Sequence, residues 1–151
     1  MKSKVILFAI FCLSLSVFYS CGENEDPVNT IVLTDDDIIG KWVFTEISAE
    51  ATLSGVPQSS TDNNPSGFVE FFSDRTGLSE FDTELIGFPF VEMHTITWER
   101  VSDNQVNLTP EDGATDLWTV TSLATDEIEA NWEIDFGSIG RATIYAKMVS
   151  E

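Results

Sequence analysis

The sequence is poor in cysteine, in basic side chains and in histidine. Seven lysine and arginine residues stand against 26 aspartate and glutamate residues, which gives a formal net charge of −19. Proteins hold nucleic acids by neutralising phosphates with lysine and arginine, so this charge balance excludes nucleic-acid binding. The single histidine, His94, leaves no second candidate base for a nucleophile–histidine pair. No cluster has metal-ligand spacing and no glycine loop opens a helix to hold phosphate. We therefore expect a protein that is not an enzyme and that has neither metal nor cofactor.

The first twenty residues have the layout of an export signal. Lys2 and Lys4 precede an apolar run over residues 5–19, which is broken only by two serines. The run is too short for a membrane-spanning helix, which needs about 20 apolar residues. We expect residues 1–20 to be removed as a signal peptide. Its removal changes the formal charge from −19 to −21, because Lys2 and Lys4 are lost, and it removes Cys12, so no disulfide can form within the mature chain.

The end of this segment resembles the lipobox of bacterial lipoproteins. Residues 17–21 end in Cys21, and Ser20 is small as the motif requires, whereas Phe18 and Tyr19 depart from it. The resemblance implies that Cys21 becomes the first residue of the mature protein and carries the lipid. The alternative is an ordinary cleavage site beside a free thiol.

Residues 21–33 are predicted to form an acidic tether between the lipid and the folded domain. Residues 22–27 are polar and acidic and lack any periodicity. They resemble the export signal that sends some lipoproteins of Gram-negative bacteria to the cell surface, although a solvated spacer would have a similar composition. We expect a protein anchored to the outer membrane on its periplasmic or cell-surface face.

Residues 34–151 are predicted to form one all-β domain preceded by a short helical turn. Thr34 is a suitable N-cap, and the three aspartates that follow it favour the positive end of a helix. From Lys41 onward, β-branched and aromatic residues alternate with turns rich in glycine, asparagine and aspartate. We expect strands at Lys41–Ala49, Gly67–Ser73, Leu78–Ile86, Phe88–Val101, Gln105–Thr109, Thr115–Leu123, Glu127–Phe136 and Arg141–Val149.

Eight hairpin-connected strands favour an antiparallel up-and-down meander that closes into a barrel. The clearest strand is 127–136, in which apolar residues at even positions alternate with polar residues at odd positions. An eight-strand sandwich without a cavity is the alternative. The connection over residues 50–65, rich in serine, threonine, asparagine and proline, is predicted to be a long loop of the kind that forms lids or binding loops.

The beginning and the end of this domain resemble the lipocalins. Gly40, Lys41 and Trp42 enter the first strand after the helical turn, which looks like the Gly-x-Trp opening of that family. In lipocalins this tryptophan packs across the closed end of the barrel near a basic side chain of the last strand. The resemblance therefore implies a barrel plug formed by Gly40, Trp42 and Lys147.

The fourth predicted strand contains the candidate ligand-binding residues. If its aromatic side chains face inward, Glu92 and His94 are carried into the barrel with them, and an apolar pocket with a few polar groups is the usual form of a small-molecule site. A bulge near Pro89 or Val91 would instead turn both polar groups toward water. The inward-facing set would be Phe88, Phe90, Glu92, His94, Ile96 and Trp98, of which all but Ile96 are candidate ligand contacts.

Two functions agree with these patterns. The first is a membrane-anchored carrier of a small, mainly apolar ligand, with Glu92 and His94 setting its orientation. The second is an envelope interaction module that has a filled barrel and binds a protein partner. The many phenylalanines favour the second function, because large rings fill the interior of a small barrel.

Overall fold

The computed structural model describes residues 30–111 and 113–151. The predicted signal peptide at residues 1–20, Cys21 and most of the predicted acidic tether lie outside these residues. At the end of the predicted tether, Leu33 is 1% exposed and its N–H donates to the carbonyl of Asp103 at 2.6 Å. The compact unit accordingly begins at Ile31.

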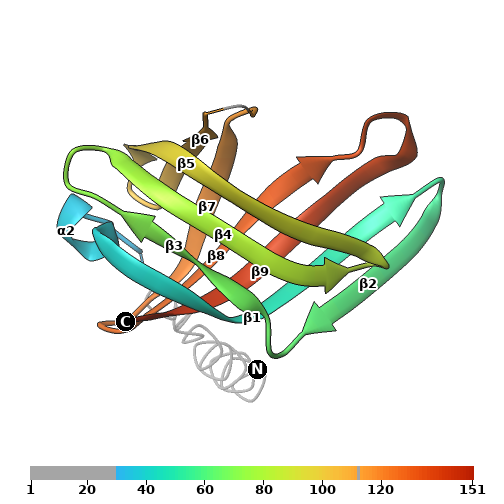
Figure 1. Cartoon of the computed structure of the whole chain (residues 1–151), viewed down its shortest axis with the longest axis horizontal. Helices are drawn as coiled ribbons and strands as arrows, with labels where there is room; N and C mark the ends of the chain where they lie inside the picture. Colours follow the sequence, from blue (N-terminus) through green and yellow to red (C-terminus); the bar gives the residue numbers. More distant parts are fainter. Residues whose placement is uncertain (1–29, 112) are drawn as a thin grey trace, which may run out of the picture. The chain divides into compact units, whose positions relative to one another are not determined.

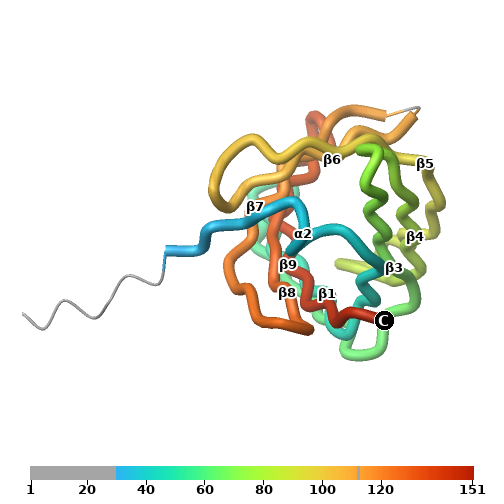
Figure 2. The backbone as a smooth tube through the Cα atoms, turned by 90° about the vertical axis from the view of Figure 1, so that its left-hand side faces the viewer, coloured from blue at the N-terminus to red at the C-terminus, as the bar shows by residue number. Residues whose placement is uncertain are grey.

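The strands form one antiparallel sheet that closes on itself (Figures 1 and 2). Eight of the strands follow the order β1-β3-β4-β5-β6-β7-β8-β9, and the pairing of β9 with β1 completes the ring. This confirms the predicted closed eight-stranded antiparallel up-and-down barrel. The strands are β1 Gly40–Leu53, β2 Val56–Asp62, β3 Ser66–Phe71, β4 Thr76–Leu85, β5 Phe88–Ser102, β6 Gln105–Pro110, β7 Asp116–Leu123, β8 Glu127–Asp135 and β9 Gly140–Ser150.

The predicted loop over residues 50–65 is wrong, because most of it is strand. β1 continues to Leu53, turns at Ser54 and Gly55, which both have positive φ, and returns as β2. The polar composition gave no sign of this hairpin, because most β2 side chains are exposed and the strand is held by main-chain pairing with β1. Its far side is tied to β4 by the hydrogen bond from Thr83 Oγ1 to Asp62 Oδ2, at 2.8 Å.

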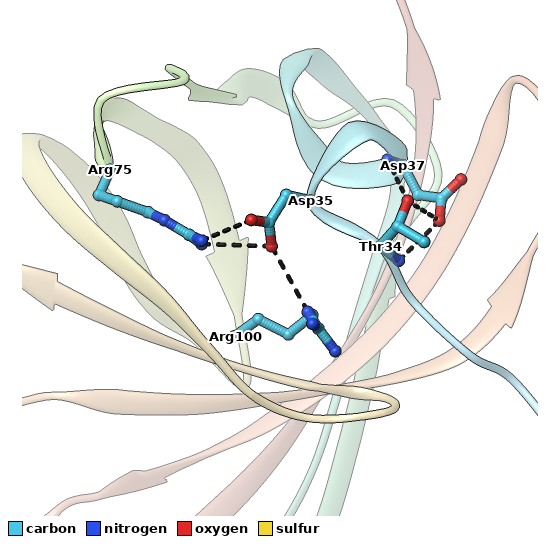
Figure 3. A network of polar contacts seen from close by, with 5 residues as sticks. All are labelled: Thr34, Asp35, Asp37, Arg75 and Arg100. Carbon is cyan, nitrogen blue, oxygen red and sulfur yellow. Dashed lines mark hydrogen bonds and ion pairs between the residues drawn. The ribbon is translucent and has the colours of Figure 1, made fainter.

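The helical turn before the barrel forms where it was predicted, as α2 (Asp35–Ile38). Thr34 caps it: its hydroxyl accepts from the N–H of Asp37, and the Asp37 carboxylate accepts from the N–H of Thr34 at 2.7 Å (Figure 3). The hydrogen bond that the Thr34 hydroxyl donates to the Asp37 carboxylate at 2.6 Å and, secondarily, the one from the Thr34 N–H lower the pKa of Asp37. The Asp35 carboxylate contacts both Arg75, in the turn after β3, and Arg100 of β5 (Figure 3). The ion pairs therefore fasten α2 across one end of the barrel.

Two tryptophans close the barrel beneath α2. Trp42 donates its indole N–H to the carbonyl of Ile38 at 2.8 Å. Trp98 packs edge-on against Phe71, and the Arg75 guanidinium lies 4.4 Å from the centroid of its ring. Both tryptophans are buried, so this end of the barrel is sealed.

The predicted position of Lys147 in the plug is wrong. Its ammonium lies on the outer surface, 3.4 Å from Glu46 and 3.9 Å from Glu129. A bulge at Thr45 shifts the β1–β9 register, so Lys147 pairs with Glu46, while Trp42 pairs with Ser150. The cation over an indole at this end is Arg75, not Lys147.

The alternation predicted for residues 127–136 is present in β8. Ile128, Ala130 and Trp132 are buried, while Glu127 and Glu133 are exposed. β8 pairs with β9 along its whole length and forms part of the barrel wall. One face of this wall is turned to the apolar interior and the other to solvent, which explains the alternation. Within the part of the chain that the structure describes, no helix is long and apolar enough to cross a membrane.

Candidate functional site

The side chains of β5 keep a regular alternation through the candidate segment. β4 and β5 pair without a register shift from Leu85 opposite Phe88 to Thr76 opposite Thr97. The alternative of a bulge near Pro89 or Val91 is therefore wrong. Val91 and Met93, each 70% exposed, point outward. The inward-facing members that line a cavity are Phe90, Glu92, His94 and Ile96.

Two of the predicted ligand contacts lie elsewhere. Phe88 sits at the end of the β4–β5 hairpin, where it is exposed and stacks on Phe136 with ring centroids 5.9 Å apart. Trp98 belongs to the sealed end described above and does not line the cavity. The alternation along β5 assigned both side chains to the correct face. It did not show that a strand of fifteen residues extends beyond the cavity at both ends.

The cavity has a volume of about 100 Å³ and a mainly apolar lining. β4 and β5 form one side of it, and β7, β8 and β9 form the opposite side. Sequence reasoning missed Ser79 and Asp116. Asp116 could have been found, because it shares the inward face of β7 with Trp118 and Val120, which follow it at every second position. The lining comprises Ile47, Ser79, Phe81, Thr83, Leu85, Phe90, Glu92, His94, Ile96, Leu108, Pro110, Asp116, Trp118, Trp132, Ile134 and Ile144.

The cavity lies beside a break in the barrel wall between β5 and β8. The β5–β6 ladder begins only at Ile96, and the β7–β8 ladder ends at Asn131. Residues 88–94 of β5 and 132–135 of β8 therefore have no ladder partner on the sides that face this break. The cavity reaches solvent where the exposed Glu92 lines it.

The cavity wall contains two stacked indoles. Trp118 and Trp132 lie nearly parallel, with ring centroids 4.3 Å apart and an angle of 9° between the planes. Phe81 packs on Trp132 at 6.0 Å, tilted by 56°. Because the rings are buried against each other, they form a rigid aromatic surface beside the open space.

The indole N–H groups divide the tryptophans into two classes. Those of Trp42 and Trp98 donate to backbone carbonyls at the sealed end. Those of Trp118 and Trp132 donate to no residue that the structure describes, and among these residues no side-chain polar atom is both fully buried and unpaired. The indole N–H groups of Trp118 and Trp132 are therefore not fully buried, so water or a guest can accept a hydrogen bond from them.

The polar groups of the mouth are two carboxylates and a histidine. Glu92 Oε2 lies 3.2 Å from His94 Nε2. Asp116 enters from β7 on the opposite side of the break, and its side chain forms no hydrogen bond or ion pair with the described residues. Burial of the carboxyl and, secondarily, the negative charge of Glu92 raise the pKa of Asp116. The mouth is thus an acidic rim above an aromatic interior.

Comparison with known proteins yields similarity of structure alone. No protein-family model and no curated protein matches the chain. A solved structure described as "Odorant Binding Protein OBP1" is similar over 80% of this chain and 75% of its own, with 11% identity and a TM-score of 0.49. Another, "Bovine Odorant Binding Protein deswapped triple mutant", is similar over 76% of this chain and 74% of its own, with 13% identity and a TM-score of 0.47. At these values, the ligand of this protein has to be inferred from its own cavity.

The cavity presents polar groups and apolar surface side by side. Among residues 30–111 and 113–151, no group of three or more histidine, cysteine, aspartate or glutamate side chains is placed to hold a metal ion. The cavity provides hydrogen-bond acceptors on Glu92 and Asp116, donors on two indoles, and apolar surface between them. Such a set of groups can hold a guest and fix its orientation.

Proposed function

We propose that this protein binds a small, mainly apolar organic molecule in the cavity between β5 and β8. The observation that carries the proposal is the cavity itself, an aromatic and aliphatic space with a few polar groups at its mouth. A dry apolar cavity of about 150 Å³ accepts benzene, so a volume of about 100 Å³ suits one small ring or the end of a longer molecule. The open cavity favours this function over that of a filled barrel binding a protein partner.

Filling the cavity is expected to abolish binding. The Ser79 side chain lines the cavity and is buried, so Ser79→Leu places a branched apolar side chain in the space that the guest would occupy. In the native protein, titration with benzyl alcohol is expected to shift the indole N–H resonances of Trp118 and Trp132 and to leave those of Trp42 and Trp98 in place. In Ser79→Leu, we expect the affinity for benzyl alcohol to fall at least about tenfold because the guest loses its buried contacts.

Thr95→Leu provides the matched control, because Thr95 is exposed on the outer face of β5. It should bind benzyl alcohol as the native protein does. Circular dichroism would verify that both variants are folded. If Ser79→Leu binds as tightly as Thr95→Leu, the guest does not occupy this cavity and the proposal fails.

We also propose that a lipid on Cys21 anchors the protein to the bacterial outer membrane, with the residues between Cys21 and the compact unit that begins at Ile31 as the tether. The lysines and the apolar run at residues 1–20, followed by the lipobox resemblance ending in Cys21, support this proposal. Anchoring would place the barrel at the periplasmic or cell-surface face of the membrane. Stable attachment requires more than one acyl chain, which a lipidated N-terminal cysteine supplies.

Cys21→Ser is expected to remove the anchor entirely. The protein would lose incorporation of an alkyne-tagged fatty acid and move from the membrane fraction to the soluble fraction, because no other residue is expected to carry lipid. Ser20→Ala serves as control, since alanine is also small and should preserve processing. Unchanged membrane association of Cys21→Ser would contradict the anchoring proposal and leave that of ligand binding intact.

A further inference from the structure

We infer that the ligand is a small organic cation, an amine whose ammonium group lies between Glu92 and Asp116 while its apolar part contacts the aromatic wall. This inference rests on the proposed binding function and specifies the chemical class of the ligand. It follows from three features of the cavity: two carboxylates at a mouth that no described lysine or arginine lines, the hydroxyl of Ser79, and the indole surface of the wall.

Among the described residues that line the cavity, only His94 can balance the negative charge of the mouth. Glu92 and Asp116 enter from strands on opposite sides of the break, and none of the described lysines or arginines lines the space. His94 lies beside Glu92, with which it forms an ion pair when protonated, and forms none with Asp116. An anionic guest would be repelled by both carboxylates, whereas an ammonium group would be attracted by both.

The state of Asp116 supports the same conclusion. Its carboxyl is half-buried, is unpaired among the described residues, and has a raised pKa because of its burial and the nearby charge of Glu92. A cation at the mouth would compensate both unfavourable effects, since it interacts with the charged form of each carboxyl. The acidity of the whole chain adds a long-range field that draws cations toward the protein.

A further polar group lies deeper in the cavity. Ser79 is 4% exposed, and its hydroxyl makes no hydrogen bond with any residue that the structure describes. Ser79 of β4 pairs with His94 of β5, so it lies on the strand next to the one that carries Glu92. Because no described side-chain polar atom is both fully buried and unpaired, this hydroxyl is accessible from the cavity, where the N–H group of an amine can donate to it.

The aromatic wall suits the remainder of a cationic ligand. An ammonium group within about 6 Å of an aromatic ring is attracted to the ring face, most strongly by tryptophan. Trp118 and Trp132 supply apolar contact area for an alkyl or aryl group attached to the amine. The cavity therefore combines the two kinds of surface that an amphiphilic amine presents.

Three probes of matched size test the inference: benzylamine, which is protonated at pH 7, benzyl alcohol, which is neutral, and benzoate, which is an anion. Each would be titrated into the full-length protein at pH 7 while the indole N–H resonances of Trp118 and Trp132 are followed. We expect benzylamine to bind about five- to tenfold more tightly than benzyl alcohol, and benzoate to bind most weakly, because partly desolvated charges interact strongly. Raising the salt concentration should reduce the preference.

Charge-neutralising variants locate the origin of the preference. Glu92→Gln and Asp116→Asn are each expected to lower the ratio of benzylamine to benzyl alcohol affinity several-fold, because each removes a charge that only the cationic probe is attracted to. Glu99→Gln is the matched control, because it removes the same charge from the exposed outer face of β5 and should leave the ratio unchanged.

The outcomes separate the two proposals. Equal affinities for benzylamine and benzyl alcohol, or a preference for benzoate, would overturn the cation inference and leave ligand binding standing. A benzylamine preference that Glu92→Gln and Asp116→Asn do not reduce would also overturn it, because the charge would then act from elsewhere. Binding of none of the three probes would overturn the proposed function itself.

Discussion

Replacement of Trp98 by alanine is expected to lower the free energy of unfolding by about 3–5 kcal/mol, as is usual for a large buried ring. The indole is 3% exposed, packs against Phe71 and Arg75, and donates its N–H to the carbonyls of Phe72 at 3.0 Å and Thr76 at 3.1 Å. The substitution thus leaves a cavity at the sealed end and removes the donor from the β3–β4 turn. Urea denaturation followed by circular dichroism measures the change.

Trp98→Phe separates the ring from the hydrogen bonds. Phenylalanine retains much of the apolar volume but donates to neither carbonyl, so a smaller loss of about 1–3 kcal/mol is expected. Neither variant should alter binding of benzyl alcohol, because Trp98 does not line the cavity. A loss below about 1 kcal/mol for Trp98→Ala would show that the sealed end does not support the barrel as described.

Gly140→Ala is expected to destabilise the protein by roughly 2–5 kcal/mol, through backbone strain and overpacking together. Gly140 begins β9 with a φ of +141°, a conformation that residues with a Cβ rarely adopt. A Cβ at this position would lie 2.2 Å from the carbonyl oxygen of Thr52 in the paired strand β1. Because the obstructing atom belongs to the backbone, either β1 or β9 has to move, and thermal denaturation should report a lower midpoint.

Gly137→Ala is the control for strain without a clash. Gly137 also has positive φ, at +65°, but a Cβ there meets no atom within 4 Å. We expect a loss of about 1–2 kcal/mol, the cost of the left-handed conformation for a residue with a Cβ. Equal effects of the two substitutions would contradict the role assigned to the contact between Gly140 and Thr52.

Much of the barrel was predictable because its signals are local. Hydrophobic alternation identifies the inward face of each regular strand, as in β8, and the capping sequence at Thr34 and Asp37 identifies the start of α2. Both signals depend on the geometry of neighbouring residues, so they can be recognised without knowledge of the fold. The same alternation placed Phe90, Glu92 and His94 together on one face of β5.

The mistakes arose where a partner strand decides the structure. β2 consists largely of polar residues and is a strand because β1 supplies its hydrogen bonds. Lys147 was misplaced for a different reason: the resemblance to lipocalins was followed although the alternation within β9 turns Ala146 and Met148 inward and Lys147 outward. Asp116 was overlooked because its importance comes from Glu92, which lies 24 residues earlier in the chain and on the other side of the cavity.

The amino-acid sequence alone determined that the chain is all-β, where its turns lie, where the capped helical turn forms and which face each strand side chain occupies. These features depend on contacts between residues that are close together in the chain. Tertiary structure alone decided which end of the barrel is sealed, where the wall is broken, and which carboxylates share the mouth. These features depend on the lengths and registers of the ladders between strands. A side chain's inward direction is a local property, whereas the space that it faces is created by the strands opposite it.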